Sequence, residues 1–136
     1  MLVTQPTILY VENDPQSRHV IEVLLIDVMG FSNLITFESS EHFLERLHQL
    51  PTCPDVMFLD IQMQPHDGYE MLTMLQTDPV YQSVPIIAMT ASVTASDIDN
   101  LRQAGFSGLI GKPINRLRFP ALVEQILAGE SVWFVT

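Results

Sequence analysis

The chain has 136 residues, of which 47% are hydrophobic, enough for one compact core but too few residues for two comfortable domains. Its formal net charge of −10 comes from 16 acidic and 6 basic residues that do not cluster, which argues against nucleic acid or membrane partners. The single cysteine excludes an internal disulfide, and no apolar stretch approaches the roughly 20 residues that span a bilayer. We therefore expect one cytoplasmic domain over residues 1–136, with a core at about 6–128 and an apolar C-terminal segment at 129–136.

The first half of the chain reads as two strand–helix units. Residues 7–11 are short, apolar and β-branched, and Asp14 then stands where a helix N-cap is expected. Apolar residues recur at helical spacing until Gly30, which is typical of a C-terminal stop. Residues 33–37 predict a second strand, and residues 40–50 predict a second helix.

The same alternation continues through the second half of the chain. Strands are expected at 55–59, 84–89 and 108–110, and helices at 68–75, 95–104 and 117–128. Strands that alternate with helices of this length pair in parallel through right-handed crossovers. The pattern therefore predicts an α/β fold of three layers, with helices on both faces of a five-stranded sheet.

Polar residues stand where four of these strands end. Glu12 and Asn13 follow the first strand, Asp60 the third, Thr90 the fourth and Lys112 the fifth, and Lys112 is the only lysine in the chain. The carboxyl ends of parallel strands share one edge of the sheet, so these side chains are expected to meet in one crevice. Each has an ordinary alternative: a solvated loop acid, a strand threonine or a surface lysine.

Four sequence pieces in this order resemble the receiver domains of bacterial response regulators, and the match covers nearly the whole chain. They are Ile8–Pro15, Pro54–Met63 with Asp67-Gly68, Pro85–Ala91 and Gly111–Pro113. Each piece alone is weak, but together and at strand ends they form a specific signature. The resemblance implies the flavodoxin-like fold, with a parallel five-stranded sheet of order 2-1-3-4-5.

The resemblance also implies a site. Asp60 would accept a phosphoryl group from a histidine kinase or phosphotransfer protein, Lys112 would pair with that group, and the Thr90 hydroxyl would hydrogen-bond to it. Mg²⁺ would offset the repulsion between the carboxylate and the phosphoryl oxygens. Its expected ligands are Glu12, Asn13, Asp60 and the backbone carbonyl of Gln62.

Three departures from the family pattern bear on this mechanism, and one is the loop beside Asp60, where Gln64 follows Met63 in place of the usual proline. Asn13 stands where relatives usually carry a second acid, so we expect weakened Mg²⁺ affinity. Leu109 stands where many receivers carry an aromatic residue that moves on activation, so a switch would depend more on the loop 90–94 and the helix after it.

Three functions stay open at this point. The leading one is a phosphoryl-accepting switch, which is not an enzyme beyond slow self-dephosphorylation. Asn13 favours the alternative of a pseudo-receiver that is never phosphorylated and serves as a docking module. An aspartyl-phosphate phosphatase is the weakest reading, because Gln62 occupies the place of its general acid.

Partners beyond the phosphodonor are expected to carry the output. The resemblance allows a homodimer through the fourth helix, fifth strand and fifth helix. The final residues 131–136 are unusually apolar for a terminus, and docking on the protein's own surface is the simplest expectation for them.

Overall fold

The computed structural model describes residues 5–135, in which strands and helices alternate along the chain. The strands are β1 (Ile8–Val11), β2 (Leu34–Phe37), β3 (Val56–Asp60), β4 (Ile86–Thr90), β5 (Gly108–Gly111) and β6 (Trp133–Phe134). The helices are α1 (Pro15–Glu22), the π-helix η1 (Val23–Val28) that continues it, α2 (Phe43–His48), α3 (Gly68–Gln76), α4 (Ala95–Ala104) and α5 (Phe119–Leu127). None of the helices in this part of the chain combines the length and the apolar composition that a membrane-spanning helix requires.

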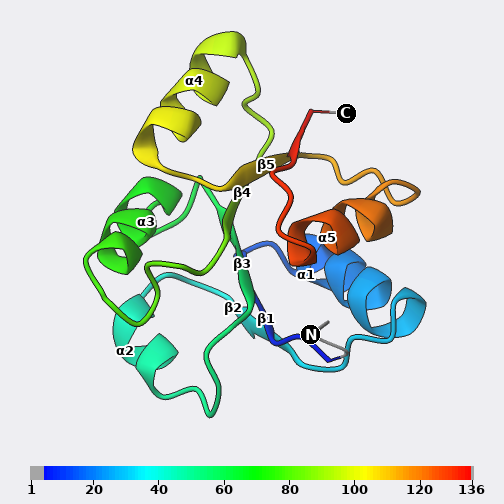
Figure 1. Ribbon diagram of the computed structural model, residues 1–136, viewed down its shortest axis with the longest axis horizontal. Helices are drawn as coiled ribbons and strands as arrows, with labels where there is room; N and C mark the ends of the chain where they lie inside the picture. Colours follow the sequence, from blue (N-terminus) through cyan, green and yellow to red (C-terminus); the bar gives the residue numbers. More distant parts are fainter. Residues whose placement is uncertain (1–4, 136) are drawn as a thin grey trace.

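The strands form one parallel sheet of order β2-β1-β3-β4-β5-β6 in the described part of the chain. The order 2-1-3-4-5 that the resemblance to receiver domains implied is therefore confirmed, and so is the flavodoxin-like architecture. The sixth strand, β6, was not predicted as a strand. It lies against the outer edge of β5 (Figure 1), so the expectation that the final apolar residues dock on the protein itself is confirmed for Trp133 and Phe134, while Thr136 lies outside the described residues.

Helices cover both faces of the sheet and enclose a core on each (Figure 1). On one face, alternate strand residues such as Leu9 and Met57 pack against α2, α3 and α4. On the other face, their neighbours, such as Tyr10 and Phe58, pack against α1, η1 and α5. Because β1, β3, β4 and β5 are buried on both faces, they read as continuous apolar runs.

Most helix ends lie where their capping residues stand in the sequence. Asp14 accepts hydrogen bonds from the backbone N–H groups of Gln16 and Ser17, as expected of an N-cap. Gly30 and Gly105 have φ angles of 75° and 109°, a left-handed conformation that glycine adopts without steric cost. Asp14 therefore fixes where the loop after β1 enters α1, and Gly105 fixes where the chain leaves α4 toward β5.

The second helix begins later than the sequence predicted. We expected it from residue 40, but α2 begins at Phe43. Ser40 is fully buried, and its hydroxyl donates to the His66 carbonyl and accepts from the His66 N–H. A residue bonded in this way to a distant loop is held out of the helix, and His42 then turns the chain with a positive φ of 52°.

Candidate functional site

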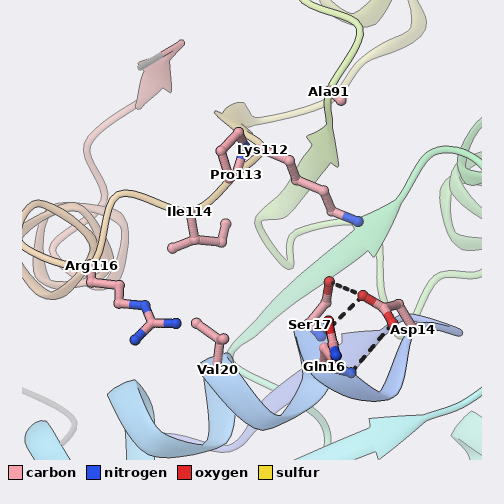
Figure 2. Close-up of a pocket in the computed structure, with 9 residues that line it drawn as sticks. All are labelled: Asp14, Gln16, Ser17, Val20, Ala91, Lys112, Pro113, Ile114 and Arg116. Carbon is pink, nitrogen blue, oxygen red and sulfur yellow. Dashed lines mark hydrogen bonds between the residues drawn. The ribbon is translucent and has the colours of Figure 1, made fainter.

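The carboxyl edge of the sheet borders an open cleft of about 440 Å³ between α1 and the segment that follows β5. Ser17 and Val20 line it from α1, and Ile114 and Arg116 line it from the opposite side (Figure 2). The side chain of Lys112 extends along its border toward the end of β3. Lys112 is thus the strand-end residue that borders this cleft, and its side chain leads from the cleft toward the other polar strand ends.

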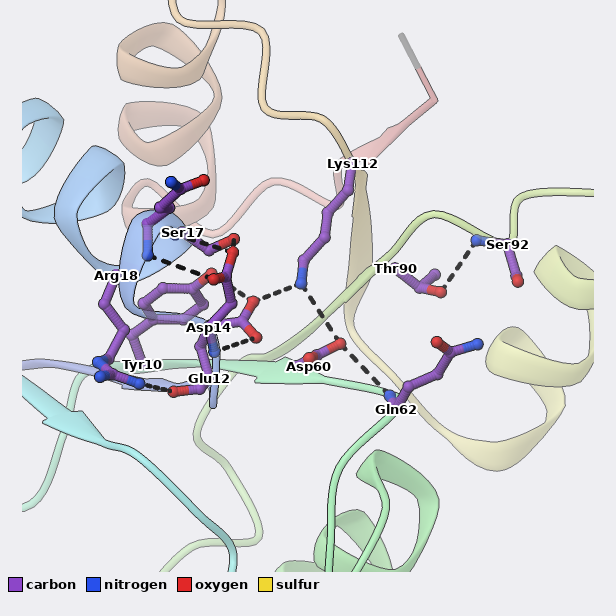
Figure 3. A network of polar contacts seen from close by, with 11 residues as sticks. Tyr10, Glu12, Asp14, Ser17, Arg18, Asp60, Gln62, Thr90, Ser92 and Lys112 are labelled. Atoms are coloured by element: carbon purple, nitrogen blue, oxygen red, sulfur yellow. Dashed lines mark hydrogen bonds and ion pairs between the residues drawn. The ribbon is translucent and has the colours of Figure 1, made fainter.

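Lys112 brings together the acids that end two different strands. Its ammonium donates a hydrogen bond to Oε1 of Glu12, and the same Nζ lies 3.5 Å from Oδ1 of Asp60 (Figure 3). Glu12 is 1% exposed and Asp60 is 6% exposed. The expected convergence of residues from β1, β3 and β5 is thus present, although Glu12 and Lys112 are 100 positions apart.

Two buried carboxylates share one ammonium, and this shifts their pKa values in opposite directions. Burial and the neighbouring Glu12 carboxylate raise the pKa of Asp60 to about 6, and the attraction of Lys112 offsets only part of this. Burial also opposes the charged form of Glu12, but the hydrogen bond from Lys112 leaves the pKa of Glu12 below its usual range. Glu12 therefore holds the ion pair, while the Asp60 carboxylate is the less stabilised of the two.

Two side chains that sequence reasoning missed fix Glu12 in place. The hydroxyl of Tyr10 donates to Oε1 of Glu12 at 3.0 Å, and burial together with Glu12 holds the pKa of Tyr10 above its ordinary range. Arg18 donates from Nη1 to the carbonyl oxygen of Glu12 at 2.7 Å. Strand periodicity carried a signal for Tyr10, because residues two apart on a strand face the same side.

Thr90 and Gln62 lie on the far side of Asp60 from β1 (Figure 3). The buried Thr90 accepts a hydrogen bond from the N–H of Ser92 through Oγ1 at 3.1 Å, which leaves its hydroxyl proton available for donation. The N–H of Gln62 donates to Oδ1 of Asp60 at 3.3 Å, and the Gln62 side chain is exposed. Thr90 and Gln62 thus border Asp60 from the loops after β4 and β3.

The oxygen donors at the ends of β1 and β3 match a hard divalent cation in type, but the acids are few. Glu12 and Asp60 supply carboxylates, and the exposed Asn13 can supply a neutral carbonyl. Within residues 5–135, no group of three or more histidine, cysteine, aspartate or glutamate side chains is placed to hold a metal ion. The donor set therefore fits Mg²⁺ in the type of its atoms. It carries one negative charge fewer than a site with an acid at both positions 12 and 13.

A parallel α/β sheet with acids, a hydroxyl and a lysine gathered at its carboxyl edge defines a receiver-type signalling domain. The family model for the response regulator receiver domain matches residues 8–124. The chain belongs to this family. Receiver domains are phosphoryl-accepting switches of two-component systems rather than classical enzymes; they bind Mg²⁺ in the active site and interact with histidine kinases or phosphotransfer proteins.

Relatives include both separate regulators and parts of kinases. The response regulator DivK of Brucella anthropi is 32% identical over 104 residues, covering 76% of this chain and 81% of DivK. The histidine-protein kinase BarA of Escherichia coli is 30% identical over 126 residues, which is 93% of this chain but only 13% of BarA. The chain therefore spans a small part of the BarA relatives that it matches.

Solved structures agree with the fold. A putative response regulator from Chloroflexus aurantiacus aligns with a TM-score of 0.80 and 24% identity over 91% of this chain and 98% of that one. The receiver domain of sensor histidine kinase PA1611 from Pseudomonas aeruginosa aligns with a TM-score of 0.78 and 24% identity, over 91% of this chain and 98% of its own. The latter holds a magnesium ion in its active-site cleft.

Proposed function

We propose that this chain is a phosphorelay receiver that accepts a phosphoryl group on Asp60 from a histidine kinase or a phosphotransfer protein. The observation that carries the proposal is the placement of the Lys112 ammonium between the two buried acids, 3.5 Å from Oδ1 of Asp60. A cation beside a buried carboxylate is what a nucleophile needs when its substrate is an anionic phosphoryl group.

In this proposal an Asp60 oxygen attacks the phosphorus of a phosphohistidine. The new O–P bond forms as the N–P bond breaks, and the released imidazole nitrogen takes up a proton. Lys112 pairs with the phosphoryl oxygens as a point charge, and the Thr90 hydroxyl donates its available proton to another of them. The donor would approach along the cleft beside α1, which Lys112 borders and whose walls combine apolar Val20 with polar Ser17.

Mg²⁺ is the proposed cofactor, and it would neutralise charge that builds up between the carboxylate and the phosphoryl oxygens. Its proposed ligands are the side chains of Glu12, Asn13 and Asp60 and the backbone carbonyl of Gln62. We infer weakened affinity for two reasons. Asn13 is neutral, and Oε1 of Glu12 already accepts from Lys112 and Tyr10.

A second candidate is a pseudo-receiver that uses the same fold only for docking. The observation in its favour is the short supply of acids near Asp60, because Asn13 replaces a charged ligand and the Lys112–Glu12 pair already balances one carboxylate. Such a protein would fold normally and would never carry a phosphoryl group.

One experiment separates the two candidates. The protein is incubated with acetyl phosphate or a phosphoramidate over a range of Mg²⁺ concentrations, and its intact mass is measured. A switch gains one phosphoryl group, and the Asp60→Ala variant gains none. A pseudo-receiver gains none at any Mg²⁺ concentration, and a gain that persists in Asp60→Ala would place the acceptor elsewhere.

A further inference from the structure

Residues 131–135, here called the β6 segment, lie beyond the family match at residues 8–124 and add a strand to the sheet. Trp133 pairs with Leu109 and Phe134 pairs with Ile110, both in parallel register. The N–H of Leu109 donates to the carbonyl of Val132 at 2.8 Å, and Val132 is 6% exposed. The segment therefore closes an edge at which β5 would otherwise present unpaired backbone groups.

Two glycines in β5 make room for this approach. A Cβ added to Gly108 would lie under 3.0 Å from the carbonyl oxygen of Val132, and one added to Gly111 would lie equally close to that of Val135. Real Cβ atoms essentially never come so near. The two ends of β5 are thus shaped to accept a backbone along this edge.

The adjacent aromatic residues of the segment are each covered by an arginine, from opposite sides of the sheet. The guanidinium of Arg102, on α4, lies 4.1 Å from the centre of the Trp133 ring. That of Arg118, at the start of α5, lies 5.1 Å from the centre of the Phe134 ring. Trp133 packs against the core under α4 and Phe134 against the core under α5, so the edge recognises two neighbouring aromatic side chains.

The connection to the segment is short and contains a glycine. Only residues 128–130 separate α5 from the segment, and Gly129 has a φ of 92°. Ser131 anchors the start of the segment by donating to the carbonyl of Ser107 at 3.0 Å and accepting from Nε1 of Trp133 at 2.9 Å. A change of backbone angles at this connection would release the segment without disturbing α5.

We propose that the edge of β5 is an exchangeable strand-docking site, filled here by the chain's own β6 segment and filled in a dimer by the β6 segment of a second copy. The occupant follows from the recognition elements. The two glycines of β5 admit a strand whose backbone comes very close at both ends, and the two arginines cover two adjacent aromatic rings. The segment Val132-Trp133-Phe134 of this same sequence is a strand of that kind. The proposal does not depend on phosphorylation of Asp60.

Two variants of the 136-residue chain test the exchange by complementation. In the blocked variant, Gly108→Ala closes the docking edge and sets its own segment free. In the open variant, Val132→Asp, Trp133→Ala and Phe134→Ala leave the edge intact but remove the segment's ability to dock. Because Trp133 is the only tryptophan in the chain, fluorescence of a mixture reports on the blocked variant alone.

Each variant alone is expected to sediment as a single chain, and an equimolar mixture is expected to form a species of twice that mass. Trp133 emission should shift to shorter wavelength on mixing, as the ring enters the partner's edge. Unchanged sedimentation and emission in the mixture would overturn the proposal.

The matched control adds Gly108→Ala to the open variant, which blocks its edge as well. This control should form no complex with the blocked variant, and a complex that persists would also overturn the proposal, because the contact would then lie elsewhere. Circular dichroism and cooperative thermal unfolding check each variant before mixing. If Gly108→Ala does not fold, Gly111→Ala replaces it, since the nearest atoms to its added Cβ all belong to Val135.

Discussion

The polar residues at the carboxyl edge of the sheet lie on two sides of Asp60, and the two sides differ in how many of the expected charged groups they carry. The sheet order β1-β3-β4-β5 places Asp60 in the middle. On the β1 side stand one buried acid, Glu12, and a neutral, exposed Asn13. On the β4–β5 side stand a buried hydroxyl, Thr90, and the only lysine of the chain, Lys112. The half suited to phosphoryl oxygens has its expected residues, and the half suited to a cation lacks one acid.

Lys112 connects the two halves and shows how the difference is balanced. Its ammonium lies between the two acids and donates to Glu12 (Figure 3), because a buried carboxylate without a partner is costly. One ammonium thus pairs with two acids, and its attraction to Asp60 is the weaker because Asp60 is the more distant of the two. In the folded chain Lys112 therefore neutralises Glu12, and Asp60 keeps only the more distant contact at 3.5 Å.

The largest expected effect comes from removing the residue that joins the halves. Lys112→Met leaves Glu12 and Asp60 as two buried acids without their cation, and we expect a loss of about 2–4 kcal/mol in the free energy of unfolding. Urea unfolding at pH 7 measures it. Arg116→Met is the matched control, because Arg116 is an exposed cation on the same segment, and it should change stability by less than about 0.5 kcal/mol. Equal losses in the two variants would contradict this account.

Removing the charge of Asp60 should have the opposite sign. The pKa of Asp60 is raised to about 6 in the folded protein, so ionisation of this group destabilises the fold. The penalty is absent below the unfolded pKa near 4, grows as pH rises, and is complete above about 6. Asp60→Asn should therefore stabilise the protein by about 1–2 kcal/mol at pH 7 and by almost nothing at pH 3.5.

Thermal unfolding at the two pH values measures the effect of Asp60→Asn. The exposed Asp27 supplies the control, since Asp27→Asn should have little effect at either pH. A gain from Asp60→Asn that is as large at pH 3.5 as at pH 7 would show that charge is not its cause.

The central features of the fold and site could be predicted because they follow from local rules and topology. Helix α4 was predicted at about 95–104 with Gly105 as its stop, and the structure places it at Ala95–Ala104, where Thr94 also caps its start. Glu12, Asp60 and Lys112 were expected to meet because parallel strands share a carboxyl edge, and the structure brings them together. Their roles in phosphoryl transfer stay predictions.

The remaining features depend on contacts between distant segments, which periodicity does not record. The β6 segment pairs for only two residues, and its place depends on clearance at Gly108 and Gly111 that no strand pattern reveals. The late start of α2 depends on the bond between Ser40 and the backbone of His66. The preference of Lys112 for Glu12 reflects which acid is more deeply buried and better hydrogen-bonded.

The β1 half can be completed by one substitution. Asn13→Asp restores a second acid after β1, and we expect Mg²⁺ affinity to rise roughly tenfold, the effect of about 1.4 kcal/mol from one added charge. Calorimetric titration with Mg²⁺ measures it. Asp14→Asn is the control, because Asp14 caps α1 through its side chain and asparagine caps equally well, so the affinity should stay nearly unchanged. Equal affinities for wild type and Asn13→Asp would remove Asn13 as the cause of weak binding.

The smallest expected change in the free energy of unfolding comes from removing a hydrogen bond to Glu12, the buried acid that follows β1. Tyr10→Phe keeps the ring in the core and removes a single hydrogen bond to Oε1 of Glu12, so it should cost about 1 kcal/mol. Lys112 donates to the same oxygen, so the two donors should not act independently. In a Lys112→Met background Glu12 keeps Tyr10 as its only side-chain donor among residues 5–135, and Tyr10→Phe should then cost more than it does in the wild type. A double-mutant cycle by urea unfolding measures the difference, and strictly additive losses would mean that Tyr10 and Lys112 stabilise Glu12 separately.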